Sequence, residues 1–186
     1  MRPYLIIVYG GPFSGKTTLA AVLGRSLAGK TALVSTDHLA GASIPVRDED
    51  ALAELDMVHV QLRLLVANYL KNGYNVVVEG PFLFERDGVL HSFESDIDQV
   101  VALMRNLASK AMIVRLSATD DEVSRRAQAL GRAGEAATAM LVAAALKPRY
   151  GARHHVFDTG ASSAAVIAAA VCDEIRAAPA ISAGFD

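Results

Sequence analysis

The chain opens with an apolar run, a glycine-rich loop and an amphipathic helix, and this succession constrains the fold more than any other feature. Residues 4–9 (YLIIVY) form a continuous apolar stretch, typical of a parallel strand buried on both faces. From Lys16 to Leu27, leucine and valine recur at helical spacing until Gly29. We therefore predict a strand-loop-helix unit at the start of a parallel α/β sheet.

The loop itself (GGPFSGKT) fits the pattern G-x-x-x-x-G-K-[ST] at every fixed position. In this setting backbone N–H groups surround a phosphate, Lys16 reaches the β- and γ-phosphates, and the Thr17 hydroxyl serves Mg²⁺. A plain glycine turn beside a surface lysine is the alternative, which the full motif in this setting disfavours. We expect ATP, or GTP in its place, with Mg²⁺. The residues expected to bind the nucleotide are Gly10, Gly11, Pro12, Phe13, Ser14, Gly15, Lys16, Thr17, Thr18 and Arg126.

Four further apolar runs alternate with helical patterns along the rest of the chain. We expect the later strands at 32–35, 75–79, 111–116 and 155–158. The expected helices cover 48–71, 95–108, 119–130, 135–146 and 162–177, and 82–94 reads as an apolar loop. Five strands alternating with helices predict an α/β protein. We expect one domain over 1–178, with an Arg-rich lid around 125–153 and a flexible tail over 179–186.

Composition and charge narrow the class of protein. Of 186 residues, 52% are hydrophobic and 20% are charged, the balance of a globular domain. No window reaches the roughly 18 uninterrupted apolar residues of a membrane span, and no cleavage-site pattern follows the N-terminal run, so we expect a cytoplasmic protein. A net charge of −2 argues against long nucleic acid. The single cysteine, Cys172, excludes disulfides and cysteine metal sites within one chain, and we expect it in the core.

Together with the loop, three later motifs give the chain a family resemblance: residues 35–38 (STDH), residues 76–80 (VVVEG) and the Arg-rich stretch 125–132. The chain resembles small P-loop kinases of the nucleoside/nucleotide kinase group. That group also holds shikimate and gluconate kinases, chloramphenicol phosphotransferase and zeta-toxin-like kinases. The resemblance implies a three-layer αβα sandwich with a five-stranded parallel sheet in the order 2-3-1-4-5. It also implies a mobile lid before the last strand and an acceptor site opposite the phosphate loop.

Two carboxylates follow predicted strands at the edge where a ligand would bind. Asp37 comes just after the second strand, and ligands of open α/β sheets lie beyond the carboxyl ends of strands. It could accept a hydroxyl proton and align the acceptor, or be a turn or cap residue beside His38, which we read as a loop residue. Glu79 closes the third strand and could hold Mg²⁺ or serve as the base, or turn to solvent. Which carboxylate is the base stays open.

Arginines of the predicted lid are candidates for contacts with the nucleotide. The resemblance implies that one of Arg126 and Arg132 contacts adenine and the other phosphate, with Arg125 as a substitute for Arg126. Guanidinium groups suit this because they stay charged and bind phosphate oxygens in pairs. The alternative is an ordinary solvated helix face. Arg149 and Arg153 are candidates for contacts in the lid or with the acceptor. We expect residues 158–160 to lie beside the nucleotide base.

The predicted loop at 82–94 is a candidate wall of the acceptor pocket. Its apolar and isolated polar residues have the composition of a ligand pocket, although aromatics that only cover the core are as compatible with the pattern. Arg63, in the predicted helix over 48–71, is likewise either a residue of the acceptor pocket or one that only packs on the core. The loop residues concerned are Phe82, Phe84, Arg86, His91 and Phe93.

These features lead to one function hypothesis and two alternatives. We expect a kinase that moves the γ-phosphate of ATP to a hydroxyl of a small molecule, a metabolite or an antibiotic. The first alternative is a kinase of a nucleotide, a sugar nucleotide or a polynucleotide end. The second alternative is a nucleotide-binding switch. The sequence has no Asn-Lys-x-Asp motif, which reads guanine in GTPases, and no strand that ends in consecutive carboxylates, as in motor ATPases, and both absences argue against a switch. A homodimer is left open.

Overall fold

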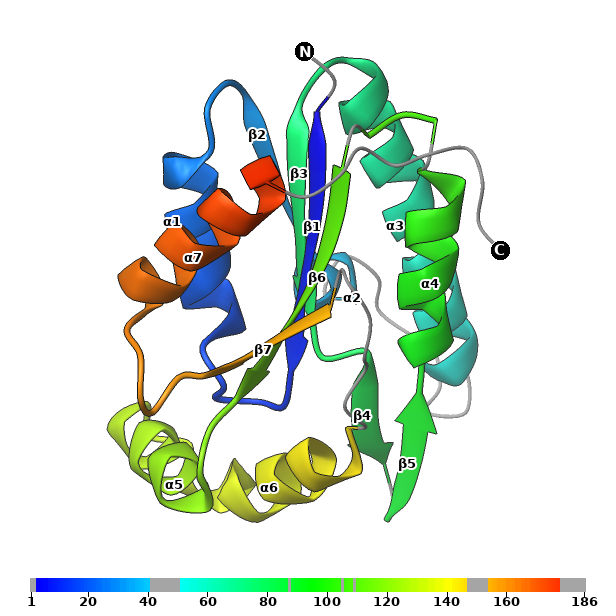
Figure 1. Cartoon of the computed structure of the whole chain (residues 1–186). Helices are drawn as coiled ribbons and strands as arrows, with labels where there is room; N and C mark the ends of the chain where they lie inside the picture. Colours follow the sequence, from blue (N-terminus) through cyan, green and yellow to red (C-terminus); the bar gives the residue numbers. More distant parts are fainter. Residues whose placement is uncertain are drawn as a thin grey trace.

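A five-stranded parallel sheet forms the centre of the computed structural model, which describes residues 3–40, 51–86, 88–104, 106–108, 110–146 and 154–177. The strands lie in the order β2-β3-β1-β6-β7 (Figure 1). Counted along the chain as parallel strands, this is the predicted order 2-3-1-4-5, because β4 and β5 form a separate hairpin. The sheet strands are β1 (Tyr4–Gly10), β2 (Thr31–Ser35), β3 (Asn75–Gly80), β6 (Lys110–Ser117) and β7 (His154–Asp158).

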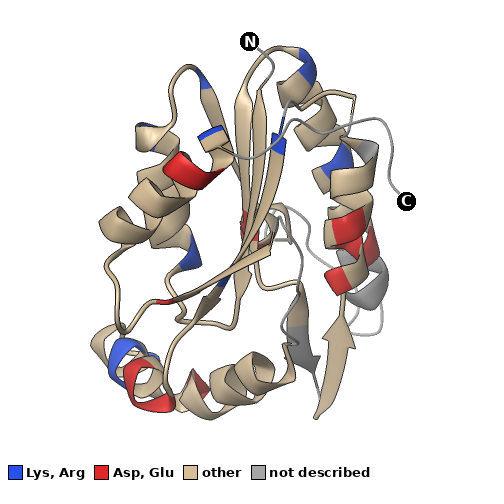
Figure 2. Ribbon diagram, in the orientation of Figure 1, with Lys and Arg blue, Asp and Glu red and all other residues tan. Residues whose placement is uncertain are grey.

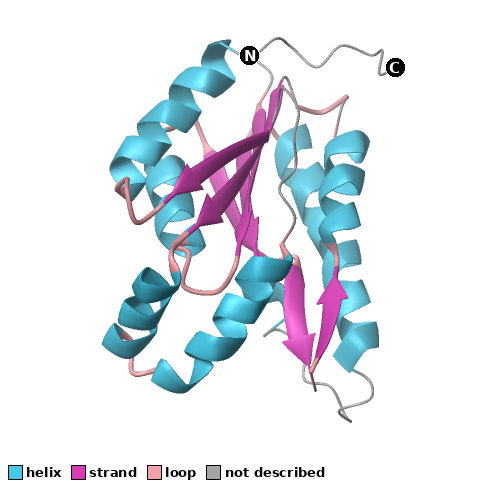
Figure 3. Ribbon diagram, turned by 60° about the horizontal axis from the view of Figure 1, so that its bottom comes forward, coloured by secondary structure: helices cyan, strands magenta, loops and turns pink. Residues whose placement is uncertain are grey.

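Helices cover both faces of the sheet, as the predicted αβα sandwich requires (Figure 1). Helices α1 and α7 pack together on one face and α3 and α4 on the other, while α5 and α6 lie beyond the carboxyl ends of the strands (Figures 1 and 3). The helices are α1 (Lys16–Ser26), α2 (Thr36–Ala40), α3 (Ala51–Lys71), α4 (Glu94–Leu103), α5 (Asp120–Ala129), a 3-10 turn (Ala133–Glu135), α6 (Ala136–Ala145) and α7 (Ala164–Ala177). Within the described part of the chain, none of them is long and apolar enough to cross a membrane.

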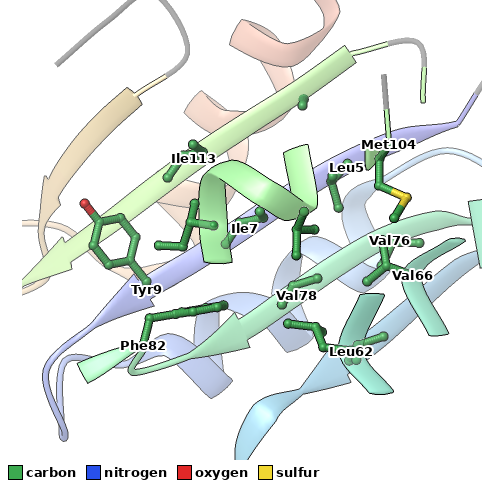
Figure 4. Packing of buried hydrophobic residues seen from close by; sticks show 14 of the residues in the cluster. Leu5, Ile7, Tyr9, Leu62, Val66, Val76, Val78, Phe82, Met104 and Ile113 are labelled. Atoms are coloured by element: carbon green, nitrogen blue, oxygen red, sulfur yellow. The ribbon is translucent and has the colours of Figure 1, made fainter. Parts of the chain in front are cut away.

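Two apolar cores flank the sheet because successive side chains of a strand point to opposite faces. In β1, Ile7 packs with Leu62 of α3 and Val78 of β3 (Figure 4). Its neighbour Ile6 belongs to the other core, with helices α1 and α7. Cys172 is buried in that second core, which confirms its expected place as a core residue.

The stretch 82–94 corrects the prediction of an apolar loop. It contains an antiparallel hairpin, β4 (Leu83–Arg86) and β5 (Val89–Ser92), so helices do not separate all the strands. Gly88, at φ 77°, lies in the turn, and the sequence Asp-Gly before β5 is typical of a hairpin turn.

Smaller differences concern the ends of helices. Residues 36–40 form the short helix α2, so His38, which we read as a loop residue, lies in a helix. Helix α4 ends at Leu103, before the predicted 108. The predicted helix over 135–146 begins with a 3-10 turn. The stretch 125–153, predicted as a lid, is described as far as Leu146, so Arg149, Arg153 and the predicted tail lie outside the described residues.

Candidate active site

The glycine-rich loop joins β1 to α1 and leaves the first N–H groups of that helix facing outward. Gly15 is the N-cap of α1, with φ 91°, a left-handed conformation that glycine adopts without strain. No side chain caps the helix there. The first backbone N–H groups of a helix have no partner within it, and with the helix dipole they favour an anion. The loop therefore has the backbone geometry of a phosphate cradle.

Lys16 lies inside this loop with two carboxylates facing it. Its Nζ donates a hydrogen bond to the Gly11 carbonyl at 3.0 Å, and the side chain is buried. Burial lowers the pKa of Lys16, while the negative charges of Asp37 and Glu79 oppose that shift. Helix α1, helix α2 and strand β3 thus bring one ammonium and two carboxylates to the same edge of the sheet.

Thr17 and Glu79 meet directly below the loop. The Thr17 hydroxyl donates to Glu79 Oε2 at 3.3 Å, and Glu79 is only 4% exposed, so its side chain does not turn to solvent. Mg²⁺ prefers oxygen ligands and usually keeps several waters, taking one or two protein groups plus phosphate. A hydroxyl and a carboxylate side by side at the phosphate cradle fit that ion. Among the described residues, no group of three or more His, Cys, Asp or Glu could hold a metal by itself.

A cavity of about 600 Å³ opens over the loop and brings most of the predicted site residues together. The phosphate loop with Lys16, the pair Asp37 and Pro81, and residues of α5 and the following turn all contribute to its lining. Figure 2 shows basic and acidic residues side by side on α5. The lining residues are Pro12, Phe13, Gly15, Lys16, Thr17, Thr18, Asp37, Pro81, Arg125, Arg126, Ala129, Leu130, Arg132 and Glu135.

Arg126 is held in place by bonds to three segments and is not part of a solvated helix face. Its Nη1 donates to the Phe13 carbonyl and to Thr159 Oγ1, both at 2.9 Å. Its Nη2 donates to the Thr159 carbonyl, and its Nε to Glu122 at 2.6 Å. Hydrogen bonds from Arg125 and Arg126 hold the pKa of Glu122 at about 2. Arg126 therefore ties α5 to the phosphate loop and to the segment after β7.

Arg132 and Arg125 are more exposed than Arg126 but line the same cavity. Arg132 forms an ion pair with Glu135, and its guanidinium lies 5.2 Å from the centre of the Phe13 ring. The Glu135 carboxylate, with a smaller contribution from Asp37, raises the pKa of Arg132. Arg125 donates to Glu122 at 2.8 Å. Arg132 thus lies against the phosphate loop, and Arg125 lines the same cavity.

A second hollow of about 280 Å³ lies beside the loop, between Thr18, Arg126 and Thr159. Ser162 and Ser163 also line it. The Thr159 hydroxyl bonds to the Ser117 carbonyl, which fixes this segment against β6. Residues 158–160, which we expected to lie beside the nucleotide base, contribute Thr159 to this hollow.

A third pocket, of about 120 Å³, lies on the far side of Asp37. Asp37 and Pro81 line both it and the large cavity, so the two spaces adjoin. Its walls also include Phe82 and Phe93, two of the predicted acceptor residues. His91 is half-buried in the hairpin, and the side chains of Phe84 and Arg86 lie outside the described residues.

One member of this pocket, His59, was missed by sequence reasoning. Its ring bonds through Nδ1 to Asp96, which also receives a hydrogen bond from Arg63 at 3.1 Å. A signal existed, because His59 and Arg63 stand one helical turn apart and Asp96 lies in the first turn of the next helix. It was too weak to select these residues, because their contact depends on how α3 and α4 pack.

The family model described as an AAA domain (AAA_33) matches residues 5–154. The chain belongs to this family. No curated protein shows a significant sequence match to this chain.

Several solved structures with a similar fold are described as kinases. A gluconokinase from Sinorhizobium meliloti 1021 is 18% identical, with a TM-score of 0.61, 95% of this chain covered and 93% of the other. The APS kinase CysC of Mycobacterium tuberculosis, in complex with AMPPNP and APS, is 16% identical, with a TM-score of 0.62 and coverage of 94% and 98%. A thymidylate kinase from Candida albicans is 15% identical, with a TM-score of 0.58 and coverage of 95% and 92%. At this identity the likeness shows a shared fold, and it confirms the resemblance to P-loop kinases at that level.

Proposed function

We propose that this AAA-family member is an ATP-dependent kinase that transfers the γ-phosphate to a hydroxyl group of a small molecule. The observation that carries the proposal is the position of Asp37, which lines both the cavity over the phosphate loop and the smaller apolar pocket. A carboxylate between a phosphate cradle and an apolar pocket can orient a hydroxyl toward phosphate. The described kinases with the same fold support this class of reaction.

The phosphate loop would hold the nucleotide through its backbone N–H groups and Lys16. Thr17 and Glu79 would hold Mg²⁺, which when bound neutralises charge on the β- and γ-phosphate oxygens. The nucleotide base would lie in the hollow between Thr18, Arg126 and Thr159. Arg126 would then contact nucleotide and loop together, and closure of the lid would bring Arg132 toward the phosphates and exclude water.

Asp37 would act on the acceptor. Its carboxylate accepts the hydroxyl proton while the acceptor oxygen bonds to the γ-phosphorus and the bond from that phosphorus to the β–γ bridging oxygen breaks, releasing ADP. Lys16 and the lid arginines stabilise the charge on the phosphate oxygens. We assign the base role to Asp37 and not to Glu79, because the Glu79 carboxylate is buried and bonded to Thr17.

The size of the apolar pocket favours a small acceptor over a nucleotide. A dry cavity of about 150 Å³ holds one benzene molecule. The pocket of about 120 Å³ would therefore take a five- or six-atom fragment, with the rest of the acceptor in the larger cavity.

The test is to incubate the protein with Mg²⁺-ATP and a panel of small hydroxyl compounds and to follow ADP release. Lys16→Ala should lower acceptor-stimulated turnover about 10²-fold or more, whereas Lys71→Ala, at the exposed end of α3, should not. Asp37→Asn should lower kcat by about 10²- to 10⁴-fold and leave the Kd of AMPPNP nearly unchanged. Tight ATP binding without stimulation by any acceptor would instead favour a nucleotide-binding switch.

A further inference from the structure

Three charged or polar side chains form a closed cluster behind the acceptor pocket. His59 of α3 is 5% exposed, and its Nδ1 lies 2.5 Å from Asp96 Oδ2. Arg63, one turn further along α3, donates to the other oxygen, Oδ1, at 3.1 Å. The carboxylate thus uses one oxygen for each partner and joins α3 to α4.

The Asp96 carboxylate sets the orientation of the His59 ring. One carboxylate oxygen accepts from Arg63, and the other lies 2.5 Å from His59 Nδ1. An ionised carboxylate can only accept hydrogen bonds, so the imidazole proton belongs on Nδ1, which faces Asp96. In the neutral imidazole the other nitrogen, Nε2, then carries a lone pair and is a hydrogen-bond acceptor.

Aromatic neighbours hold the His59 ring in position. The edge of the ring meets Phe93 with centroids 4.4 Å apart, and Phe82 lies at 5.8 Å. Both phenylalanines line the pocket together with His59 itself, Val58 and Leu83. With Thr36 and Asp37, the imidazole of His59 is one of the few polar groups among the residues that line this pocket. A few placed polar groups in an apolar pocket are what give a binding site its specificity.

We propose that His59, oriented by Asp96 and Arg63, selects the acceptor by accepting a hydrogen bond from a second O–H or N–H group of that molecule. This rests on the proposed function, in which Asp37 binds the hydroxyl that receives the phosphate. The acceptor class is a compact diol or amino alcohol with an apolar body. One polar group lies at Asp37, the body packs on Phe82 and Phe93, and the second polar group lies at His59.

Two substitutions of His59 separate selection of the acceptor from support of the fold. In His59→Asn the side-chain amide can replace Nδ1–H in the bond to Asp96 but has no atom at the place of Nε2. In His59→Gln the longer side chain carries an oxygen to the place of Nε2. The first variant therefore keeps the cluster and loses the proposed contact, and the second restores an acceptor. Urea unfolding of both variants reports whether the fold is retained.

The probes are cis-1,3-cyclohexanediol and cis-3-fluorocyclohexanol, which have similar size but differ in the second hydrogen-bond donor. Their Kd values are measured by calorimetry on the full chain, with and without AMPPNP. One hydrogen bond to a buried acceptor corresponds to a preference of about 10-fold for the diol in the unsubstituted protein. We expect His59→Asn to abolish this preference, His59→Gln to restore part of it, and the Kd of AMPPNP to stay the same in all three.

Equal affinities for the two probes, a preference that persists in His59→Asn, or no binding of either probe would overturn the inference. Because binding is measured without phosphate transfer, its outcome is separate from that of the proposed function. A diol that binds with the expected preference and is not phosphorylated by Mg²⁺-ATP would refute the kinase alone. Probes that are phosphorylated without preference would refute the role of His59 alone.

Discussion

Gly80, the last residue of β3, lies so close to α2 that a methyl group there should displace the site. A Cβ atom at Gly80 would lie 2.0 Å from the Thr36 hydroxyl oxygen and 3.0 Å from Thr36 Cβ. Ordinary contacts of this kind begin near 3.4 Å. Thr36 is buried and is followed at once by Asp37. In Gly80→Ala, therefore, α2 or the end of β3 must move by about an ångström or more.

The size of the effect follows from overpacking. Forcing extra methyl groups into a packed site costs about 1–3 kcal/mol, so the free energy of unfolding should fall by that amount. If Asp37 serves as the base, a displacement of about 1 Å should also lower kcat by about 10²-fold. Urea unfolding measures the first effect and acceptor-dependent ADP release the second. Gly134→Ala is the matched control, because a Cβ there would meet nothing within 4 Å.

A second substitution at Thr36 tests the stated cause. In Gly80→Ala/Thr36→Ala the hydroxyl is gone and only the 3.0 Å contact remains, so much of the loss should be recovered relative to Thr36→Ala alone. Gly80→Ala/Thr36→Ser keeps the hydroxyl and should recover little. Equal recovery in the two double variants, or a Gly80→Ala protein as stable as the Gly134→Ala control, would refute the reasoning.

Two further predictions concern stability. Asn75 is buried, accepts a hydrogen bond from the Tyr4 N–H at 3.0 Å and donates one to the Ala28 carbonyl at 2.9 Å. Asn75→Ala should therefore lower the free energy of unfolding, measured in urea, by about 1–3 kcal/mol. Asn106→Ala, at an exposed position, is the control and should leave it unchanged. The pKa of Glu122 is lowered from 4.5 to about 2, chiefly by the hydrogen bond from Arg125. The contribution of the ionised Glu122 to stability should therefore be complete above pH 4.5 and be lost as the pH falls toward 2. Urea unfolding across that range should show a weaker acid dependence in Glu122→Gln, and parallel curves for the two proteins would contradict this.

Much of the fold could be predicted because its signals are local. The strand-loop-helix unit needs only the residues from Tyr4 to Leu27, and the two-sided burial of β1 follows from its continuous apolar run. The hairpin β4-β5 was missed because its strands have four residues each, too few for a clear alternation. The strand order came from the family resemblance, because apolar runs alone do not specify which strands become neighbours.

The candidate site likewise has one part that local sequence signals predicted and another part that they did not. The phosphate loop with Lys16 and Thr17 is a contiguous motif, and its chemistry can be read from spacing alone. The bond of Arg126 to Thr159 joins residues 33 apart, and that of His59 to Asp96 joins residues 37 apart. Contacts of that kind leave at most a weak signal in the local pattern, because they depend on how the elements pack.

The sequence by itself therefore determined the class of fold and the phosphate cradle, because strand burial, helix spacing and loop chemistry are properties of neighbouring residues. Only the tertiary structure decided that Glu79 bonds to Thr17 beneath the loop, that Asp37 faces two adjoining spaces and that His59 lies against Asp96. The physical reason is that these partners come from different elements, and the packing of helices on a twisted sheet sets which of their side chains meet.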